Sequence, residues 1–370
     1  MAKKISKLQI AQQQAEAAAK RTNQKINDLG YQTGDLYTYL TTIQLLFDRI
    51  RNVPEDNRLK YEKLKAIRVT WKQQAEKIEM EYKKAEVKAA GQGAAGIGAG
   101  VAVAALGPTA AMGVATTFGV ASTGTAISAL SGAAATNAAL AWLGGGALAA
   151  GGGGMAAGSA FLALAGPVGW TIAGISILAS GLMFIKTKND KERLENIFTL
   201  ISDRDTKSYE LAIVELNERI TRIVSEKVKL AAAIAKIETF GTDYSQMTEA
   251  QQYELGAYVN LMEACTMLLV NPILGLQPKY TADDHRKLCL ETTIEGRKRY
   301  FVEHKSLIIT LCNLLYRITL DPKDKQLLCK SLRKNQDFLD SIQTSKKDFT
   351  DDHLYMVDLA LAHKYQYSRY

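Results

Sequence analysis

The sequence predicts an all-α protein, an elongated coiled-coil or helical bundle with a central Ala/Gly-rich hydrophobic helical hairpin and a C-terminal helical region. Apolar residues recur at steps of three and four, the 370 residues include only six prolines, and no stretch alternates apolar and polar residues over a strand length. The expected units are an N-terminal arm (1–88), a hydrophobic block (89–185), a long coiled-coil helix (186–241) and a C-terminal helical region (242–370).

The N-terminal arm predicts three amphipathic helices. A weak heptad seam occupies residues 5–29, and Gly30 and Gly34 are expected to interrupt it. A second helix follows and should end at 52–54, because the residue before a proline disfavours helical backbone. The third helix carries Trp71 as an expected core residue and runs directly into the hydrophobic block.

A long block without formal charge is the strongest signal in the chain. From Ala89 to Ile185, 97 consecutive residues include no Asp, Glu, Lys, Arg or His, and they hold 22 of the 28 glycines. About a quarter of the residues in an ordinary soluble domain are charged. Two segments, 97–121 and 159–185, meet the length of about 20 apolar residues that a bilayer-spanning helix needs. Each contains a proline (Pro108 and Pro167), which membrane helices tolerate.

Small residues in the block favour close helix packing. Gly96-x-x-x-Gly100 and Gly154-x-x-x-Gly158 have the spacing that lets helix backbones approach in lipid, although so glycine-rich a block also produces this spacing by chance. Trp170 is either an interfacial residue or a packing residue, since tryptophan serves both roles.

Basic residues flank the block on both sides, which favours placing both ends on the cytoplasmic side. An even number of crossings, as in a two-helix hairpin, satisfies this condition. A third span at 126–148 would make the number odd and would separate the two arms. The flanking residues are Lys83, Lys84 and Lys88 before the block and Lys186, Lys188 and Lys191 after it.

The arm after the block predicts one long helix from Asp190 to Thr239. Its heptad pattern is broken once, by Lys227, and Gly241 lies where a C-cap is expected. A helix of about 50 residues would be about 75 Å long, a length found in coiled coils. The C-terminal region shows shorter amphipathic helices separated by prolines.

No motif for catalysis, cofactor binding or metal binding emerges, so we expect no enzyme activity, no cofactor and no metal. Gly91-x-Gly93-x-x-Gly96 follows a charged helix instead of a strand, and no acid lies about 20 residues further on. His285 and His353 stand beside acids and are interpreted as exposed residues at helix starts. The four cysteines lack CxxC spacing and are expected to be free buried thiols: Cys265, Cys289, Cys312 and Cys329.

The charge distribution indicates a solvated helical surface. The net charge is +8, which favours an anionic surface without identifying one. Basic residues alternate with acids along the helices, as on a coiled-coil face, so no nucleic-acid partner is expected.

The order of coiled-coil arm, Ala/Gly-rich hairpin and second coiled-coil arm resembles α-helical pore-forming toxins of the cytolysin A type, and it also looks like apolipoprotein L-type proteins. Residues 122–170 are similar to a glycine-zipper segment found in many bacterial proteins. The resemblance covers mainly 89–185 and does not reach 242–370. It implies bilayer insertion, homo-oligomerisation and permeabilisation or remodelling of membranes, and it transfers no catalytic residues.

The expected function is therefore insertion into a lipid bilayer, with oligomerisation to form a pore or to perturb the membrane. The basic N-terminus lacks the apolar run of a secretory signal, so the chain is expected to start in the cytoplasm and to associate with a membrane when active. One alternative is a constitutively anchored scaffold that recruits a protein partner through 242–370. Another is a soluble helical protein whose block packs as an internal bundle.

Overall fold

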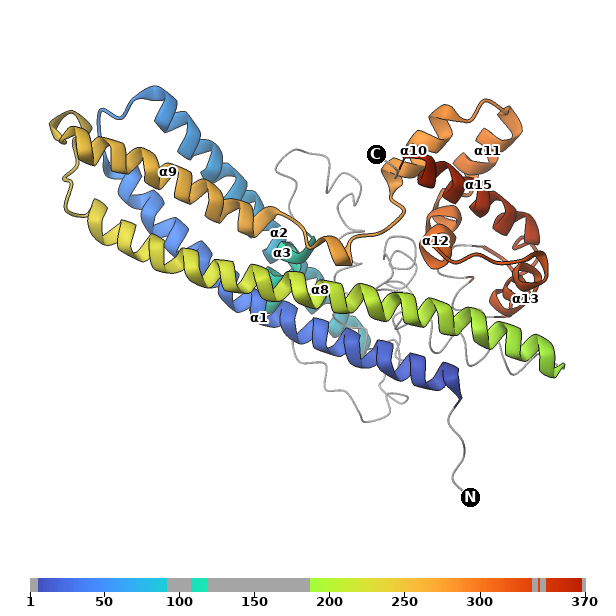
Figure 1. Ribbon diagram of the computed structural model, residues 1–370. Helices are drawn as coiled ribbons and strands as arrows, with labels where there is room; N and C mark the ends of the chain where they lie inside the picture. The colour runs from blue at the N-terminus through green and yellow to red at the C-terminus, as the bar shows by residue number, and fades with distance from the viewer. Residues whose placement is uncertain (1–5, 92–107, 119–186, 335–338, 340–343, 368–370) are drawn as a thin grey trace, which may run out of the picture.

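The computed structural model describes residues 6–91, 108–118, 187–334, 339 and 344–367. These residues form ten α-helices and two short 3₁₀ helices and contain no strand, which confirms the all-α class. Figure 1 shows a long rod of helices with a group of short C-terminal helices beside one end.

Two long helices run parallel along the rod, α1 (Lys7–Arg49) and α8 (Lys188–Ile237). Arg21 of α1 pairs with Glu210 of α8, and further along both helices Asp35 lies 2.9 Å from the Lys227 ammonium. Lys227, which breaks the heptad of α8, also donates a hydrogen bond of 2.7 Å to Gln32. The charged residue in the seam is therefore held by polar partners on α1.

Each long helix turns back at the same end of the rod. α1 is followed by α2 (Glu55–Gly91), and α8 is followed by the 3₁₀ helix η1 (Tyr244–Gln246) and by α9 (Glu249–Val270). The two turns pair through their backbones, because Arg51 donates to Thr242 at 2.9 Å and accepts from Tyr244 at 3.0 Å. Two helical hairpins thus lie side by side and form a four-helix bundle (Figure 1).

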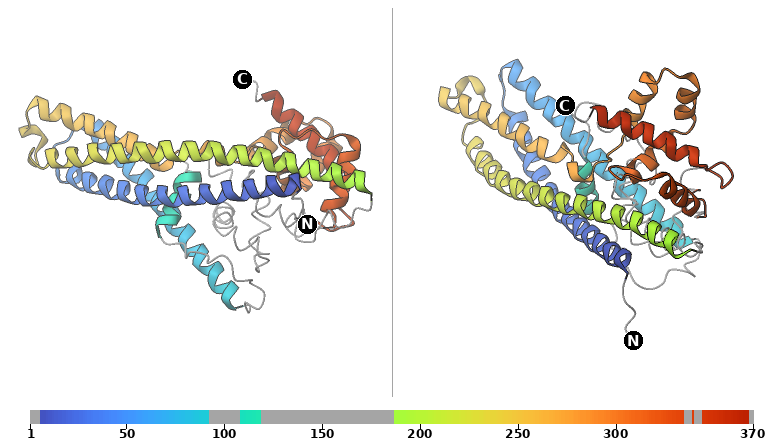
Figure 2. Two further views of the ribbon diagram at one scale, coloured as in Figure 1. Left: turned by 60° about the horizontal axis from the view of Figure 1, so that its bottom comes forward. Right: turned by 45° about the vertical axis from the view of Figure 1, so that its right-hand side comes forward.

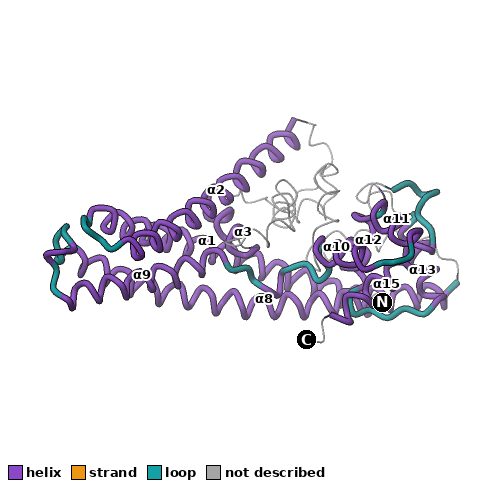
Figure 3. Tube along the Cα trace, turned by 90° about the horizontal axis from the view of Figure 1, so that it is seen from above, coloured by secondary structure: helices purple, strands orange, loops and turns teal. Residues whose placement is uncertain are grey.

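The C-terminal part of α2 leaves the rod at an angle, as the left view of Figure 2 and the view from above in Figure 3 show. Trp71 of α2 is fully buried, as predicted. α2 continues through Ala89 to Gly91, so the helix crosses the start of the charge-free block without a break.

The long helices match the sequence prediction except at two glycines. α8 spans Lys188–Ile237, close to the predicted 190–239, and Gly241 follows it with a positive φ of 81°. The prediction that Gly30 and Gly34 interrupt the first helix is wrong, because α1 is continuous through both. The physical reason is a helix that packs against them, described below.

The C-terminal subdomain spans residues 282–367, and its described residues form a group of short helices that packs beside the first half of α8. A linker with the 3₁₀ helix η2 (Leu274–Leu276) connects it to α9. Thr281 caps its first helix through a capping box with Asp284, as the acids at this position predicted. Its helices are α10 (Ala282–Glu291), α11 (Glu295–Glu303), α12 (Lys305–Leu315), α13 (Pro322–Leu332) and α15 (Asp351–Tyr367).

The sequence predicted the state of the cysteines in the C-terminal half correctly but predicted the exposure of two histidines wrongly. The prediction of free thiols is confirmed: Cys265, Cys312 and Cys329 are buried and Cys289 is half-buried. The prediction of exposed histidines is wrong, because His285 and His353 are 2% and 3% exposed. His285 faces the ring of Phe301 and His353 that of Phe349, so aromatic neighbours cover the imidazoles.

Acidification should destabilise the C-terminal subdomain through these two histidines. Burial lowers the pKa of His285 and of His353 below the usual 6.5. The unfolded chain then binds protons that the folded chain excludes, so their contribution to stability is lost as the pH falls below about 6.5. Thermal unfolding at pH 7.5 and pH 5 measures the difference, and His353→Gln should reduce it. An unchanged pH dependence in this variant would contradict the prediction for His353.

One helical segment in the described residues, Glu249–Leu276, has the length and composition of a membrane span. It consists of α9 and the residues after it, and 56% of its most apolar window is buried inside the protein. Core helices of soluble bundles pass the same test, so this segment carries no argument for insertion.

Candidate functional site: a docked helix of the charge-free block

Most residues that the sequence singled out for membrane insertion lie outside the described residues. Pro108 is the first residue of a short helix, α3 (Pro108–Phe118). Lys83, Lys84 and Lys88 belong to the last turns of α2, and Lys188 and Lys191 are exposed in the first turn of α8. The remaining residues fall outside the description: Gly96, Gly100, Gly154, Gly158, Pro167, Trp170 and Lys186.

α3 belongs to the charge-free block and is docked on the rod. It lies against α1 and α2, beside the C-terminal end of α9 (Figure 1). Ala111, Val114 and Ala115 are at most 2% exposed, and Thr116 and Thr117 are fully buried. Part of the predicted span 97–121 therefore lies in the interior of the helical rod.

Glycines make the contact between α3 and α1. A Cβ atom added to Gly113 would lie 2.1 Å from the Ile26 carbonyl oxygen and 3.0 Å from the Gly30 amide nitrogen. One added to Gly34 would lie 3.1 Å from the Met112 sulfur. At Gly113 only a residue without a side chain permits this approach, because the atoms that a Cβ would meet belong to the backbone of α1. The glycines of α1 therefore serve helix packing and do not end the helix.

Polar atoms inside this dock are paired. The indole N–H of the buried Trp71 donates to the Thr116 hydroxyl at 3.2 Å, and the Thr117 hydroxyl donates to the Gly113 carbonyl at 2.7 Å. A buried hydroxyl without a partner would cost about 1–3 kcal/mol. The dock thus satisfies the hydroxyls that a threonine-bearing helix brings into a protein interior.

The linker after α9 caps the C-terminal end of α3. The backbone N–H of Ile273 donates to the Thr117 carbonyl at 2.8 Å, and the Gln277 side chain approaches the same oxygen at 3.4 Å. The last carbonyls of a helix need partners from outside it. The linker, residues 271–281, supplies one of them to α3.

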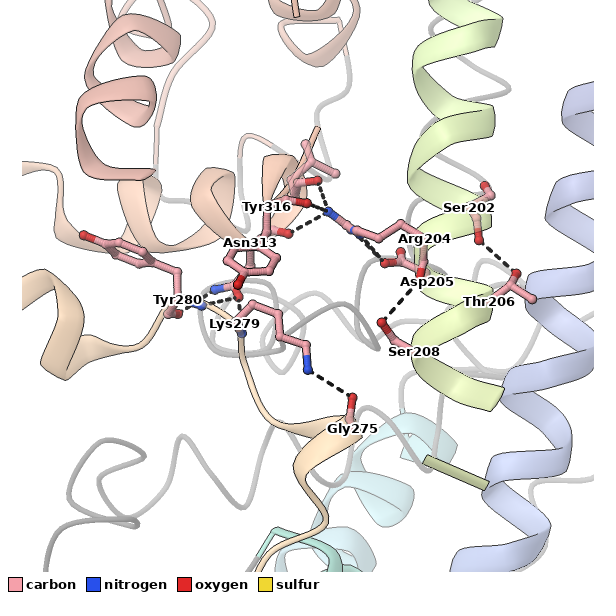
Figure 4. A network of polar contacts seen from close by, with 11 residues as sticks. Ser202, Arg204, Asp205, Thr206, Ser208, Gly275, Lys279, Tyr280, Asn313 and Tyr316 are labelled. Carbon is pink, nitrogen blue, oxygen red and sulfur yellow. Dashed lines mark hydrogen bonds and ion pairs between the residues drawn. The ribbon is translucent and has the colours of Figure 1, made fainter. Parts of the chain in front are cut away.

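The C-terminal subdomain holds the other end of this linker, as Figure 4 shows. The Asn313 side-chain oxygen accepts from the backbone N–H groups of Lys279 and Tyr280 at 2.9 and 3.0 Å. Its amide donates to the carbonyls of Tyr280 and Ile309 at 2.8 and 2.9 Å. Asn313 is fully buried, and every hydrogen-bonding position of its amide is in use.

Arg204 of α8 binds the end of α12 (Figure 4). It donates to the carbonyls of Leu314 and Tyr316 at 2.7 and 2.9 Å and, through Nε and Nη2, to one oxygen of Asp205 at 2.9 and 2.7 Å. A guanidinium is favourable at the negative end of a helix dipole. Burial raises the pKa of the Asp205 carboxyl to about 6, although the neighbouring guanidinium acts in the opposite direction.

Ion pairs fasten the same subdomain to the start of α8. Arg193 pairs with Asp321 and, at 2.8 Å, with Asp324, while Lys323 lies 2.8 Å from Asp190. These groups are in contact with solvent, so each pair contributes little to stability. Their value is positional, because they hold the helix that directly follows the charge-free block.

No protein-family model, curated protein or solved structure matches this chain. Its function therefore has to be inferred from its own residues. Within the described ranges, no group of three His, Cys, Asp or Glu side chains could hold a metal ion. Sequence reasoning found the hydrophobic block but missed Gly113, Asn313 and Arg204, since none of them stands in a motif.

Proposed function

We propose that this protein inserts its charge-free block into a lipid bilayer and stores part of that block, α3, on the helical rod beforehand. The observation that carries the proposal is the docking of α3: a charge-free segment of a predicted span lies buried on arms whose outer surfaces are charged. Such a dock gives the segment a water-excluded place before it meets lipid.

The docked helix is too short to be a membrane span. Its 11 residues measure about 17 Å, whereas the hydrocarbon core of a bilayer is about 30 Å thick. Insertion of the segment 97–121 therefore requires α3 to leave α1 and to become part of a longer helix. Because α3 is rich in Ala and Thr, we expect its docked and inserted states to differ by only a few kcal/mol.

Oligomerisation follows from the same residues. Once α3 has left, Gly113 offers its bare backbone to another helix in the membrane, where small residues at an interface permit close packing. We therefore propose that further copies of this chain are the partners after insertion, and that the assembly permeabilises or remodels the bilayer.

A reversible tether tests whether α3 has to leave its dock. In the double variant Gly34→Cys with Met112→Cys, the two thiols should oxidise to a disulfide, because the added Cβ lies so close to the Met112 sulfur. We expect the oxidised protein neither to float with anionic vesicles nor to release an entrapped dye. Reduction should restore both activities.

The two single-cysteine variants, treated with the same oxidant, control for the native cysteines. Leakage by the oxidised double variant at the wild-type rate would overturn the proposal that α3 is released, and absence of leakage by the wild-type protein would overturn pore formation. A protein that resists carbonate extraction from membranes at all times, with no soluble pool, would instead support the anchored scaffold.

A further inference from the structure

We propose that residues 271–281 are a strap through which the C-terminal subdomain keeps α3 in its dock. The strap makes two contacts. Its first half caps α3 through the Ile273 N–H, and its second half donates hydrogen bonds to Asn313 of α12. Its role as a regulator of membrane insertion rests on the proposed function, whereas its hold on α3 in water does not.

The strap has little slack between its two contacts. Gln277, which approaches the Thr117 carbonyl, is separated from Lys279, which Asn313 holds, by Pro278 alone. Residues two apart in a chain are at most about 7 Å apart, and proline fixes its own φ near −65°. A displacement of α12 therefore has to move the residues that cap α3.

The middle of the strap lies flat on α8. The Gly275 N–H donates to the Glu215 carboxylate at 3.1 Å, and a Cβ on Gly275 would lie 3.0 Å from the Ala212 backbone nitrogen. Arg219 of α8 donates to the carbonyls of Leu268 and Asn271 at 2.8 Å each. The strap thus crosses α8 in contact with its backbone, and α8 provides the fixed surface along which it is held.

The subdomain is itself anchored next to the strap, because Arg204 binds the C-terminal carbonyls of α12 just beyond Asn313 (Figure 4). Asn313 therefore connects two contacts. Its main chain belongs to the end of α12 that Arg204 of α8 binds, and its side chain binds the strap. An event that shifts the end of α12 would weaken the cap on α3 without touching α3 directly.

Hydrogen exchange of the α3 amides in the full-length protein, without lipid, tests the strap. Asn313→Ala leaves the part-buried N–H of Lys279 and the buried N–H of Tyr280 without an acceptor, so we expect α3 to exchange about tenfold faster. Gln277→Ala removes two hydrogen bonds of a half-buried side chain, one to the Thr117 carbonyl at 3.4 Å and one to the Ile273 carbonyl at 3.2 Å, and should accelerate exchange only a few-fold. This second variant keeps the test valid if Asn313→Ala does not fold.

The matched control is Leu328→Ala, which removes a fully buried side chain of α13 in the same subdomain without deleting a strap hydrogen bond. We expect it to accelerate exchange in α13 and to leave α3 protected. Equal acceleration of α3 in the control and in Asn313→Ala would overturn the strap, as would unchanged α3 exchange in Gln277→Ala and Asn313→Ala. Because no membrane is involved, these outcomes are independent of the leakage assay.

Discussion

Replacing Gly113 by alanine should detach α3 from α1. The new methyl group would lie 2.1 Å from the Ile26 carbonyl oxygen, which belongs to a helix backbone and cannot move without shifting α1 itself. Overpacking of this kind costs about 3 kcal/mol, and undocking of α3 relieves it. Chemical denaturation should show the loss of stability, and proteolysis between residues 108 and 118 should become faster. If docking restrains insertion, the variant should also bind anionic vesicles more readily than the wild type.

Gly256→Ala is the matched control, since it makes the same substitution in the middle of α9, where nothing lies within 4 Å of the added carbon. Alanine favours the helical conformation, so this variant should gain about 0.5–1 kcal/mol. Its α3 should remain protected from protease. Equal stabilities for the two alanine variants would show that α1 and α3 do not approach as closely as their glycines indicate.

Replacing Arg204 by alanine should lower the free energy of unfolding by about 3–5 kcal/mol at neutral pH, because it leaves a buried carboxylate without its charged partner. Asp205 is completely buried, and within the described residues its second oxygen, Oδ2, has no hydrogen-bond partner. The end of α12 also loses the donor to Leu314 and Tyr316. Denaturant unfolding of the variant, followed by circular dichroism, measures the effect.

The loss of unfolding free energy caused by Arg204→Ala should become smaller as the pH falls. The wild-type pKa of Asp205 is already raised to about 6 by burial, and removal of the guanidinium raises it further. A folded pKa above the unfolded one means that the carboxylate is costly at high pH, and this cost declines as the pH falls through the folded pKa. The difference between variant and wild type should therefore be smaller at pH 5 than at pH 8.

A double variant separates the effect of the unpaired Asp205 carboxylate on stability from the effect of the lost contact between residue 204 and α12. Arg204→Met with Asp205→Leu replaces the buried ion pair with apolar side chains of similar size, which is often neutral for stability. It should recover most of the stability that Arg204→Ala loses, and its stability should no longer depend on the titration of this site. A double variant as unstable as the single one would show that the contact with α12, and not the buried charge, dominates.

Helices were predictable from the sequence because their pattern is local. Residues three and four apart share a face, so the apolar periodicity of α8 determined its length to within a few residues. The turn at 52–54 followed from a proline in the same way. Gly30 and Gly34 misled the prediction, since a glycine that admits a neighbouring helix and a glycine that ends a helix look identical in sequence.

The sequence by itself determined that this chain is helical and that an uncharged block separates two charged arms. Only the tertiary structure decided that α3 lies against Gly30, that His285 is buried and that Asn313 holds the linker behind α3. Gly113 lies 83 positions from Gly30, and Asn313 lies 33 and 34 positions from Tyr280 and Lys279, so no local period encodes these contacts. A neutral helix of small residues is compatible with lipid and with a dry groove in a protein, and the choice between them depends on surfaces that folding creates.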